Sequence, residues 1–433
     1  MEIKRDTYLN RLIVRKHNSF IKVITGIRRC GKSYLLNTLF YNHLKSENIA
    51  EDHIIKFAFD TAEDLLKIGE DPLILDNQKT NKKVDPKKFL DWLLVQIKDD
   101  EMYYLLLDEV QKLGSFESVL NGFLRKNNVD VYVTGSNSKF LSKDILTEFE
   151  GRGDEIHILP LSFSEFYAFK QGEKSEVYDE YSVYGGLPTV ALMPTEEQKT
   201  NYLISQMKNV YLRDIVARYS IKDENSLGEV IDVIASGIST LTNPKKIANT
   251  INSVHNTKTC DFTIDKYISY AEDAFMLNRV KRYNVKGRKY IGTPYKIYFE
   301  DVGLRNARLS FRQIEETHIM ENIIYNELRF RGFQVDVGTV ESREKDVRGK
   351  EIRVQREIDF IATMGSNKYY IQSAYQIADG EKYKQETASF ERTKDSFKKI
   401  IIIEKSMKPR YDENGYLMMG IKEFLLDENS LKN

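Results

Sequence analysis

A glycine loop that ends in a lysine and a hydroxyl is the first feature of the chain that could do chemistry. Gly26-Ile27-Arg28-Arg29-Cys30-Gly31-Lys32-Ser33 matches the pattern GxxxxGK[ST]. In such loops the backbone N–H groups wrap a phosphate, and the dipole of the following helix favours its negative charge. The lysine neutralises β- and γ-phosphate oxygens, and the serine hydroxyl is a ligand for Mg²⁺. The loop, continued to Tyr34, predicts a binding site for ATP and Mg²⁺.

Two adjacent carboxylates follow an apolar run further along the chain. Tyr103-Tyr104-Leu105-Leu106-Leu107 leads directly into Asp108 and Glu109. A buried parallel strand that ends in acids delivers them to the crevice at the carboxyl ends of the strands. We expect Asp108 to hold Mg²⁺, mostly through water, and Glu109 to polarise the attacking water. A surface turn after a core strand is the alternative, and the two motifs together disfavour it.

Polar residues also follow the next apolar run. Residues 129–134 (VDVYVT) are followed by Gly-Ser-Asn-Ser, which would place Ser136 and Asn137 near a γ-phosphate. Side chains there could sense the phosphate and position water. Ser and Asn serve equally well as a turn or a helix cap, so both interpretations stay open.

The elements that must position these residues alternate between strand and helix. Strands are expected at 20–25, 54–60, 103–109, 129–134 and 155–161. Helical periodicity follows the glycine loop, and a helix beginning at Pro86 has Asp85 as its cap. Strand, glycine loop and helix in that order are the context that the motif requires. The pattern predicts an α/β domain with a parallel sheet over residues 1–160.

These motifs resemble those of AAA-type ATPases of bacteria and archaea. The resemblance rests on GIRRCGKS, LLLDEV, VTGSNS and Gly151-Arg152 before EIHILPLSFSEF, and it extends through residues 185–188 and 211–215. It implies a helical lid over residues 161–225. It also implies that Arg152 reaches into a neighbour's active site in a homo-oligomer, with a surface ion pair as the alternative. A second sensor at Arg213 or Arg218 is one interpretation of these arginines, and a salt bridge is favoured.

Residues 226–305 have the order of a winged helix-turn-helix, three short helices and a hairpin. Acids are absent from the hairpin between Asp273 and Glu300. Its basic residues are Arg279, Lys281, Arg282, Lys286, Arg288, Lys289 and Lys296. A basic hairpin is typical of phosphate-backbone contact. Packing against a protein domain or protection of a sheet edge are the alternatives, and the acidic third helix argues against sequence-specific readout.

Residues 306–433 follow the order helix, three strands, helix, strand, which resembles the restriction-endonuclease core. Glu357 and Asp359, followed by Gln372, resemble the PD-(D/E)xK motif, and Glu321 could add a third carboxylate. Gln372 replaces an acid, and Ala374 stands where the lysine belongs. The resemblance therefore implies a degenerate nuclease. The alternative pairs the two acids with Arg353 or Arg356.

Composition limits the remaining classes of function. The 433 residues carry 65 basic and 65 acidic side chains, so the chain has no uniformly basic coat. Two cysteines and scattered histidines predict no metal cluster, and no apolar run approaches the ~18 residues of a membrane helix. We expect a cytoplasmic ATPase that couples hydrolysis to conformational change. A nucleotide-gated switch that docks a protein or nucleic acid is the alternative, and an ATP-fuelled nuclease is a third.

Overall fold

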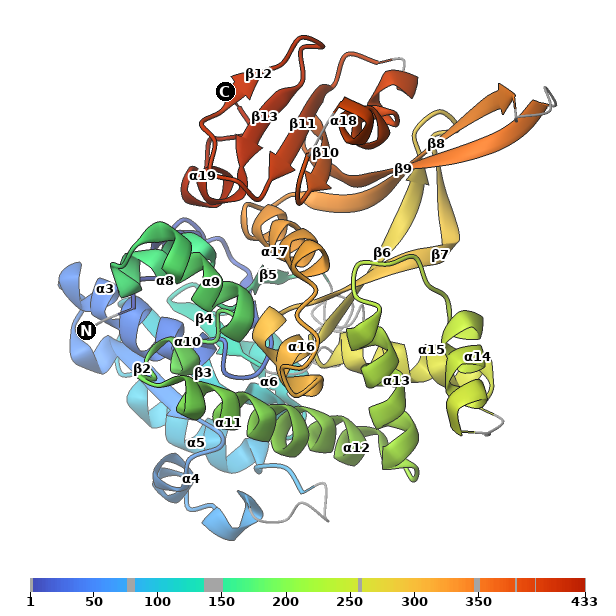
Figure 1. Cartoon of the computed structure of the whole chain (residues 1–433). Helices are drawn as coiled ribbons and strands as arrows, with labels where there is room; N and C mark the ends of the chain where they lie inside the picture. The colour runs from blue at the N-terminus through green and yellow to red at the C-terminus, as the bar shows by residue number, and fades with distance from the viewer. Residues whose placement is uncertain are drawn as a thin grey trace. The chain divides into compact units, whose positions relative to one another are not determined.

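The computed structural model describes residues 3–75, 82–135, 151–255, 259–345, 351–377, 380–393 and 395–432 (Figure 1). The chain forms two compact units. Unit 1 comprises Met1–Pro160 with Asp273–Phe275, and unit 2 comprises Leu161–Glu272 with Met276–Asn433. None of the described helices has the length and hydropathy needed to cross a membrane.

Unit 1 is built on a five-stranded parallel sheet in the order β2-β3-β4-β1-β5. The strands are β1 (Ile21–Thr25), β2 (Ile54–Ala58), β3 (Tyr103–Asp108), β4 (Val129–Thr134) and β5 (Gly153–His157). Every residue of β1 and β3 is buried, as expected for central strands covered on both faces. The parallel-sheet α/β fold predicted from the sequence is confirmed.

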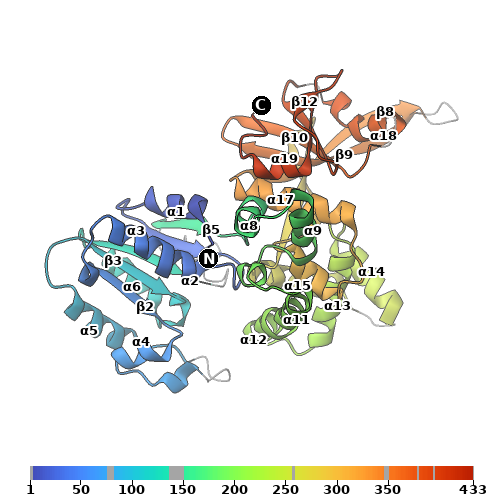
Figure 2. The ribbon, with the colours of Figure 1, turned by 60° about the vertical axis from the view of Figure 1, so that its left-hand side comes forward.

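Helices cover both faces of this sheet, with α1 and α3 on one side and α5 on the other (Figure 2). The helix after the glycine loop runs through α2 (Lys32–Tyr34), the π-helical segment η1 (Leu35–Phe40) and α3 (Tyr41–Ser46). The ring of Phe40 lies 4.5 Å from that of Tyr132 on β4, which fixes the helix on the sheet. The remaining helical segments are α1 (Asp6–Ile13), η2 (Glu51–His53), α4 (Ala62–Lys67), η3 (Pro72–Leu75), α5 (Pro86–Gln96), η4 (Val110–Lys112) and α6 (Phe116–Phe123).

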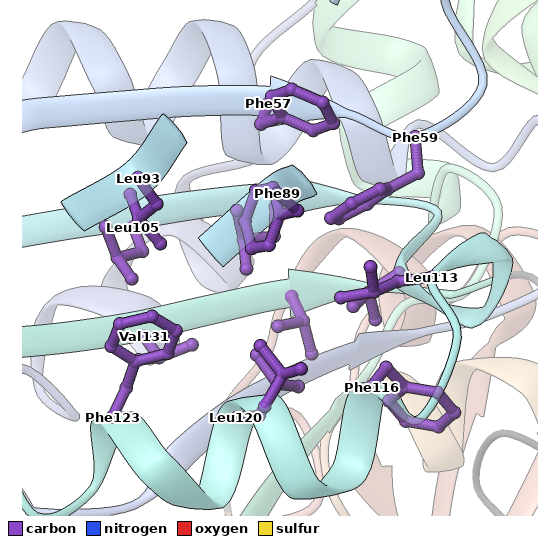
Figure 3. Packing of buried hydrophobic residues seen from close by; sticks show 14 of the residues in the cluster. Phe57, Phe59, Phe89, Leu93, Leu105, Leu113, Phe116, Leu120, Phe123 and Val131 are labelled. Atoms are coloured by element: carbon purple, nitrogen blue, oxygen red, sulfur yellow. The ribbon is translucent and has the colours of Figure 1, made fainter. Parts of the chain in front are cut away.

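An aromatic core lies under α5 and α6 (Figure 3). Phe57 packs against Phe59 and Phe89 with ring centroids 4.7 and 5.1 Å apart. Helix α5 begins as expected, because the Asp85 carboxylate accepts a hydrogen bond from Lys87 N at 2.8 Å and Pro86 needs no donor partner. The packed core holds the carboxyl ends of β2, β3 and β4 at one edge.

Unit 2 begins with helices, as the sequence predicted for its first part. They are α8 (Phe163–Lys170), α9 (Lys174–Tyr184), α10 (Pro188–Ala191), α11 (Glu196–Gln206), η6 (Met207–Leu212), α12 (Arg213–Tyr219), α13 (Glu224–Ser236), α14 (Pro244–His255) and α15 (Asp261–Asp273). The loop at Gly185-Gly186 packs on Asp301, whose carboxylate accepts a hydrogen bond from Gly186 N at 2.8 Å. A side chain at Gly185 would clash with that carboxylate at 2.3 Å. Arg218 pairs with Asp214, so the salt-bridge interpretation is confirmed for Arg218.

The second sheet of unit 2 has eight strands in the order β12-β13-β11-β10-β9-β8-β6-β7. Its strands are β6 (Leu277–Asn284), β7 (Lys289–Phe299), β8 (Gln334–Lys345), β9 (Glu351–Met364), β10 (Asn367–Ala374), β11 (Lys398–Ile403), β12 (Arg410–Tyr411) and β13 (Leu417–Gly420). The basic hairpin β6–β7 joins this sheet, because residues Arg282–Asn284 pair in parallel with Val337–Thr339 of β8. The domain boundary predicted between residues 305 and 306 therefore lies in the connection between β7 and β8, two strands of the same sheet.

The helices of the carboxyl-terminal part are α16 (Val302–Arg308), α17 (Glu316–Phe330), α18 (Gly380–Thr387), η7 (Phe390–Arg392) and α19 (Ile421–Leu426). Ile319, Ile323 and Leu328 of α17 are buried, as its periodicity predicted. A separate apolar cluster forms around Ile361, Tyr370, Phe390 and Ile401. It holds β9, β10 and β11 together beside the carboxylates described below.

Candidate nucleotide site

The glycine loop connects β1 to α2 in a conformation that other residues would not adopt. Gly26 has φ +140° and Gly31 has φ +100°. A Cβ atom at Gly26 would lie 2.2 Å from the carbonyl oxygen of Ile158, so the backbone after β5 leaves no room for a side chain. The two glycines therefore permit the sharp turn that aims the loop at the start of the helix.

Lys32 opens that helix, and its side chain folds over the loop. Its ammonium donates hydrogen bonds to the carbonyl oxygens of Gly26 and Ile27 at 2.9 and 3.0 Å. The residue is only 5% exposed. A buried cation at a helix N-terminus, beside loop N–H groups, forms a site suited to phosphate.

Arg5, which sequence reasoning missed, braces the loop from the segment before α1. Its guanidinium donates to Cys30 O at 2.9 Å and to Leu159 O at 2.7 Å. The nearby hydroxyl of Tyr8 accepts a hydrogen bond from Leu159 N at 3.0 Å. The contact with Cys30 spans 25 residues and the two contacts with Leu159 span more than 150, and no local pattern in the sequence marks them.

Asp108 lies where the loop and the acidic strand meet. Thr134 donates a hydrogen bond to one carboxylate oxygen, and Asn37 Nδ2 lies 3.3 Å from the other. Ser33 also makes a side-chain hydrogen bond to this carboxylate. Burial raises the pKa of Asp108, and the hydrogen bonds from Thr134 and Ser33 oppose that effect. The structure thus brings Ser33 and Asp108 together, which is the donor set that suits Mg²⁺.

Glu109 follows in a left-handed backbone conformation with φ +52°. Its backbone N–H donates to Thr134 Oγ1 at 3.0 Å, and its carboxylate accepts a hydrogen bond from Gln111. Asp60, after β2, is a third acid that sequence reasoning missed. Although Asp60 is exposed, desolvation and the charges of Glu109 and Asp108 raise its pKa. The sequence contained a pattern that could have identified Asp60, because the apolar run 54–60 ends in an acid, as the run before Asp108 does.

Thr134 was missed as well, although it is fully buried between Asp108 and Glu109. The sequence predicted polar contacts two and three residues later, at Ser136 and Asn137, which lie outside the described residues. A hydroxyl at the carboxyl end of β4 could have been recognised, because β4 is the strand next to β3.

Arg152 lies near the amino-terminal ends of β1 and β5, whereas the glycine loop follows the carboxyl-terminal end of β1. Arg152 precedes β5, and its carbonyl accepts a hydrogen bond from Ile21 N at the start of β1. A five-residue strand spans about 16 Å, so Arg152 is separated from the glycine loop by the length of β1. Its side chain is exposed. In its own chain Arg152 is therefore not part of the site formed by Lys32 and Asp108.

A second cluster of ionisable groups lies in unit 2. The Lys296 ammonium contacts Glu321 at 2.8 Å, Glu357 at 2.7 Å and Asp359 at 3.2 Å, and its side chain is 4% exposed. The sequence offered Arg353 or Arg356 as alternative partners of Glu357 and Asp359, and the structure places Lys296 of the hairpin against both acids. Within the described parts of the chain, no group of three or more His, Cys, Asp or Glu side chains is arranged to hold a metal ion.

The charged groups of this cluster shift one another's pKa values. Burial alone would lower the pKa of Lys296, but the three carboxylates raise it well above its usual value. Burial raises the pKa of Glu321 to about 7, against the opposing charge of Lys296. The pKa of Glu357 is raised for the same reason. One ammonium shared by three carboxylates leaves an excess of negative charge, which favours keeping one proton on the cluster.

Fewer basic side chains of the hairpin are available to nucleic acid than its sequence indicated. Arg279 pairs with Asp265 and Glu272 of α15, at 2.6 Å for the first pair. Arg282 is buried and donates to Pro294 O at 2.9 Å. These two arginines are therefore removed from the predicted nucleic-acid surface by internal partners. Lys281, Lys286, Arg288 and Lys289 remain exposed.

Two family profiles match parts of the chain. A profile described as an AAA domain matches residues 18–167, and one described as a domain of unknown function matches residues 175–315. A Walker-type ATPase of Pyrococcus abyssi is 14% identical with a TM-score of 0.48, over 71% of this chain and 96% of its own.

Two relatives align over most of the chain. An uncharacterized protein of Methanocaldococcus jannaschii is 29% identical over 391 residues, 87% of this chain and 79% of its own. An uncharacterized protein of Haemophilus influenzae is 33% identical over 405 residues, 92% of this chain and 93% of its own. The chain therefore belongs to the same family as the Haemophilus influenzae protein, and its amino-terminal unit carries an AAA domain.

Proposed function

We propose that the chain binds ATP and hydrolyses it to ADP and phosphate, and that hydrolysis drives a conformational change in unit 2. One observation carries the proposal: the Asp108 carboxylate is hydrogen-bonded to Ser33 of the glycine loop and to Thr134 of the neighbouring strand. Phosphate-binding groups and carboxylates thereby share one site. This arrangement is typical of P-loop nucleoside triphosphatases.

The residues divide between binding and chemistry. The loop N–H groups and Lys32 bind the phosphates, and Ser33 and Asp108 would hold Mg²⁺. When bound, that ion neutralises charge on the phosphate oxygens. Glu109 accepts a hydrogen bond from the attacking water and orients it toward the γ-phosphorus. Ser136 and Asn137 are proposed to contact the γ-phosphate.

Arg152 is proposed to act on the site of a neighbouring copy. Its position at the amino-terminal end of β1 supports this role, because the side chain cannot reach the glycine loop at the other end of that strand. An arginine supplied in trans stabilises the charge that develops during phosphoryl transfer, and such a residue is worth about 10³-fold or more in turnover. The active form is then a homo-oligomer.

Substitution separates the two roles. Lys32→Ala should abolish ATP binding, whereas Glu109→Gln should retain binding and lose hydrolysis, because Glu109 acts only in the hydrolytic step. Binding is measured with a fluorescent ATP analogue, and turnover by phosphate release. Lys45→Ala and Glu101→Gln, exposed residues of the same unit, are the matched controls. Turnover of Glu109→Gln equal to that of the unsubstituted protein would exclude its assigned role.

For unit 2 we propose a winged helix joined to a restriction-endonuclease-like fold without nuclease activity. Helices α13, α14 and α15 followed by the hairpin β6–β7 support the first assignment, and the order α17-β8-β9-β10-α18-β11 supports the second. Lys296 occupies the centre of the carboxylates that a nuclease would use for its metal ion. The exposed basic residues of the hairpin are proposed to contact nucleic acid.

A further inference from the structure

The outward face of α14 is polar from Asn243 to Ser253 and carries two lysines at its first turn, whereas Val254, near its end, is 70% exposed. Two lysines, two amides and two hydroxyls surround a hollow of about 450 Å³ on this face: Asn243, Lys245, Lys246, Asn249, Thr250 and Ser253. The four residues from Lys245 to Thr250 in this set are exposed. They recur at the spacing of neighbouring positions on one side of a helix.

The opposite side of α14 anchors it firmly. Ile247, Ala248 and Ile251 are buried. At the first turn, Asn243 Oδ1 accepts a hydrogen bond from Lys246 N at 2.8 Å. At the last turn, Asn252 exchanges two hydrogen bonds with the backbone of Thr259, at 2.8 and 3.0 Å. The polar face is therefore displayed by a helix that is fixed at both ends.

The sequence around this face contains lysines and no acidic residue. Residues 233–260 contain no Asp or Glu, whereas 65 acids in 433 residues would place about four in a stretch of this length. The nearest preceding acid, Asp232, is paired with Arg308 at 2.7 Å. Among the described residues, no acid forms an ion pair with Lys245 or Lys246. The Lys246 ammonium donates one hydrogen bond, to Leu241 O at 3.1 Å, and keeps two further N–H donors for an anionic partner.

The side chains of the face indicate what that partner is. Lysine, asparagine, threonine and serine are the groups that proteins use to hydrogen-bond phosphate oxygens. The face has no aromatic residue for stacking on single-stranded bases. An α-helix fits the major groove of B-form DNA, whereas the major groove of A-form RNA is too narrow. By contrast α15 carries Asp261, Asp265 and Glu272, which repel phosphate.

We propose that α14, rather than α15, is the helix that contacts the phosphate backbone of double-stranded DNA, with Lys245 and Lys246 neutralising phosphates. The amide of Asn249 donates a hydrogen bond to the same backbone, whereas the hydroxyls of Thr250 and Ser253 already donate to Lys246 O and Thr250 O of the helix, at 3.1 and 2.8 Å. The proposal deepens the nucleic-acid contact proposed for the hairpin and does not depend on ATP hydrolysis. Because backbone contacts carry no sequence information, binding is independent of DNA sequence and sensitive to salt.

The test uses the full-length protein without nucleotide and a fluorescent 25-base-pair DNA duplex, titrated from 50 to 200 mM salt. In Lys245→Gln/Lys246→Gln the slope of log K against log salt should fall by about 2, since each phosphate contact contributes about 0.9. Lys405→Gln/Lys408→Gln, two exposed lysines elsewhere in unit 2, is the matched control and should keep the original slope. ATP turnover and melting temperature are measured on each variant to verify folding.

Each outcome decides the proposal. A reduced slope in the α14 variant alone, with turnover intact, supports it whether or not the hairpin also binds. Absence of DNA binding by the unsubstituted protein overturns it, as does an unchanged slope in the α14 variant. An RNA duplex of the same sequence bound as tightly as DNA overturns the commitment to the B-form groove. If DNA binding fails while ATP turnover persists, the ATPase proposal stands separately.

Discussion

Replacing Lys296 by Met tests the charged cluster of unit 2 most directly. The substitution keeps much of the side-chain volume but removes an ammonium that lies within 3.2 Å of three carboxylates. Breaking a buried ion pair by removing one partner costs about 3–5 kcal/mol, because the remaining charges are left uncompensated. We expect a loss of that size in the free energy of unfolding of unit 2 at pH 8.

The loss should depend on pH, with a sign that follows from the carboxyl groups. The pKa of Glu321 is raised to about 7 in the folded protein, above its unfolded value of about 4.3. A raised carboxyl pKa favours the folded state at low pH, and this contribution disappears as pH rises through about 7. Below that pH the cluster takes up protons and needs the ammonium less. The cost of Lys296→Met should therefore be smaller at pH 5 than at pH 8.

The measurement is urea unfolding at both pH values, followed by circular dichroism and by hydrogen exchange of α17 and β7. Trp92, the single tryptophan of the chain, lies in unit 1 and reports that unit separately. Lys281→Met, exposed on the same hairpin, is the control and should change stability by less than about 0.5 kcal/mol. A further Glu321→Gln substitution should restore part of the loss. A cost below about 1 kcal/mol at pH 8, or an equal cost at both pH values, would refute the reasoning.

Three further outcomes are expected. Thr134→Val should lower kcat by about tenfold to a hundredfold while ATP still binds, because Asp108 and the Glu109 backbone lose their shared partner; equal kcat values would contradict this positioning role. Arg152→Ala mixed with Glu109→Gln should regain part of the turnover that each lacks alone, and turnover independent of protein concentration would exclude a residue acting in trans. Plasmid, single-stranded DNA and RNA should stay intact in Mg²⁺ or Mn²⁺; cleavage that disappears in Asp359→Ala would show an active nuclease.

Local sequence was sufficient to predict the main elements of unit 1, because its motifs and elements coincide. The loop from Gly26 to Ser33 needs only glycine freedom and the helix that follows. The run 103–107 is apolar throughout because a central parallel strand is buried on both faces. The expected strands and the cap at Asp85 therefore appear within a few residues of their observed places.

Contacts between distant segments were decided by tertiary structure. Arg5 reaches the glycine loop across 25 residues, and Thr134 reaches Asp108 across 26. Neither has a local signature. The Arg5 contact depends on how the segment before α1 packs on the loop, and the Thr134 contact depends on strand order, which periodicity does not encode. Thr134 could have been inferred only once β4 was placed beside β3.

Strand order also decided which residues of unit 2 contact one another. The helices and strands from α13 to β11 were mostly predicted from the sequence, whereas β12, β13 and α19 were not. The parallel pairing of β6 with β8 joins the hairpin to the carboxyl-terminal strands. That pairing is consistent with Lys296 lying 63 residues before Asp359 in sequence and 3.2 Å from it in space. The sequence by itself determined which residues carry charge and which elements they occupy. Only the tertiary structure decided which charges meet, because burial and strand order select the partners.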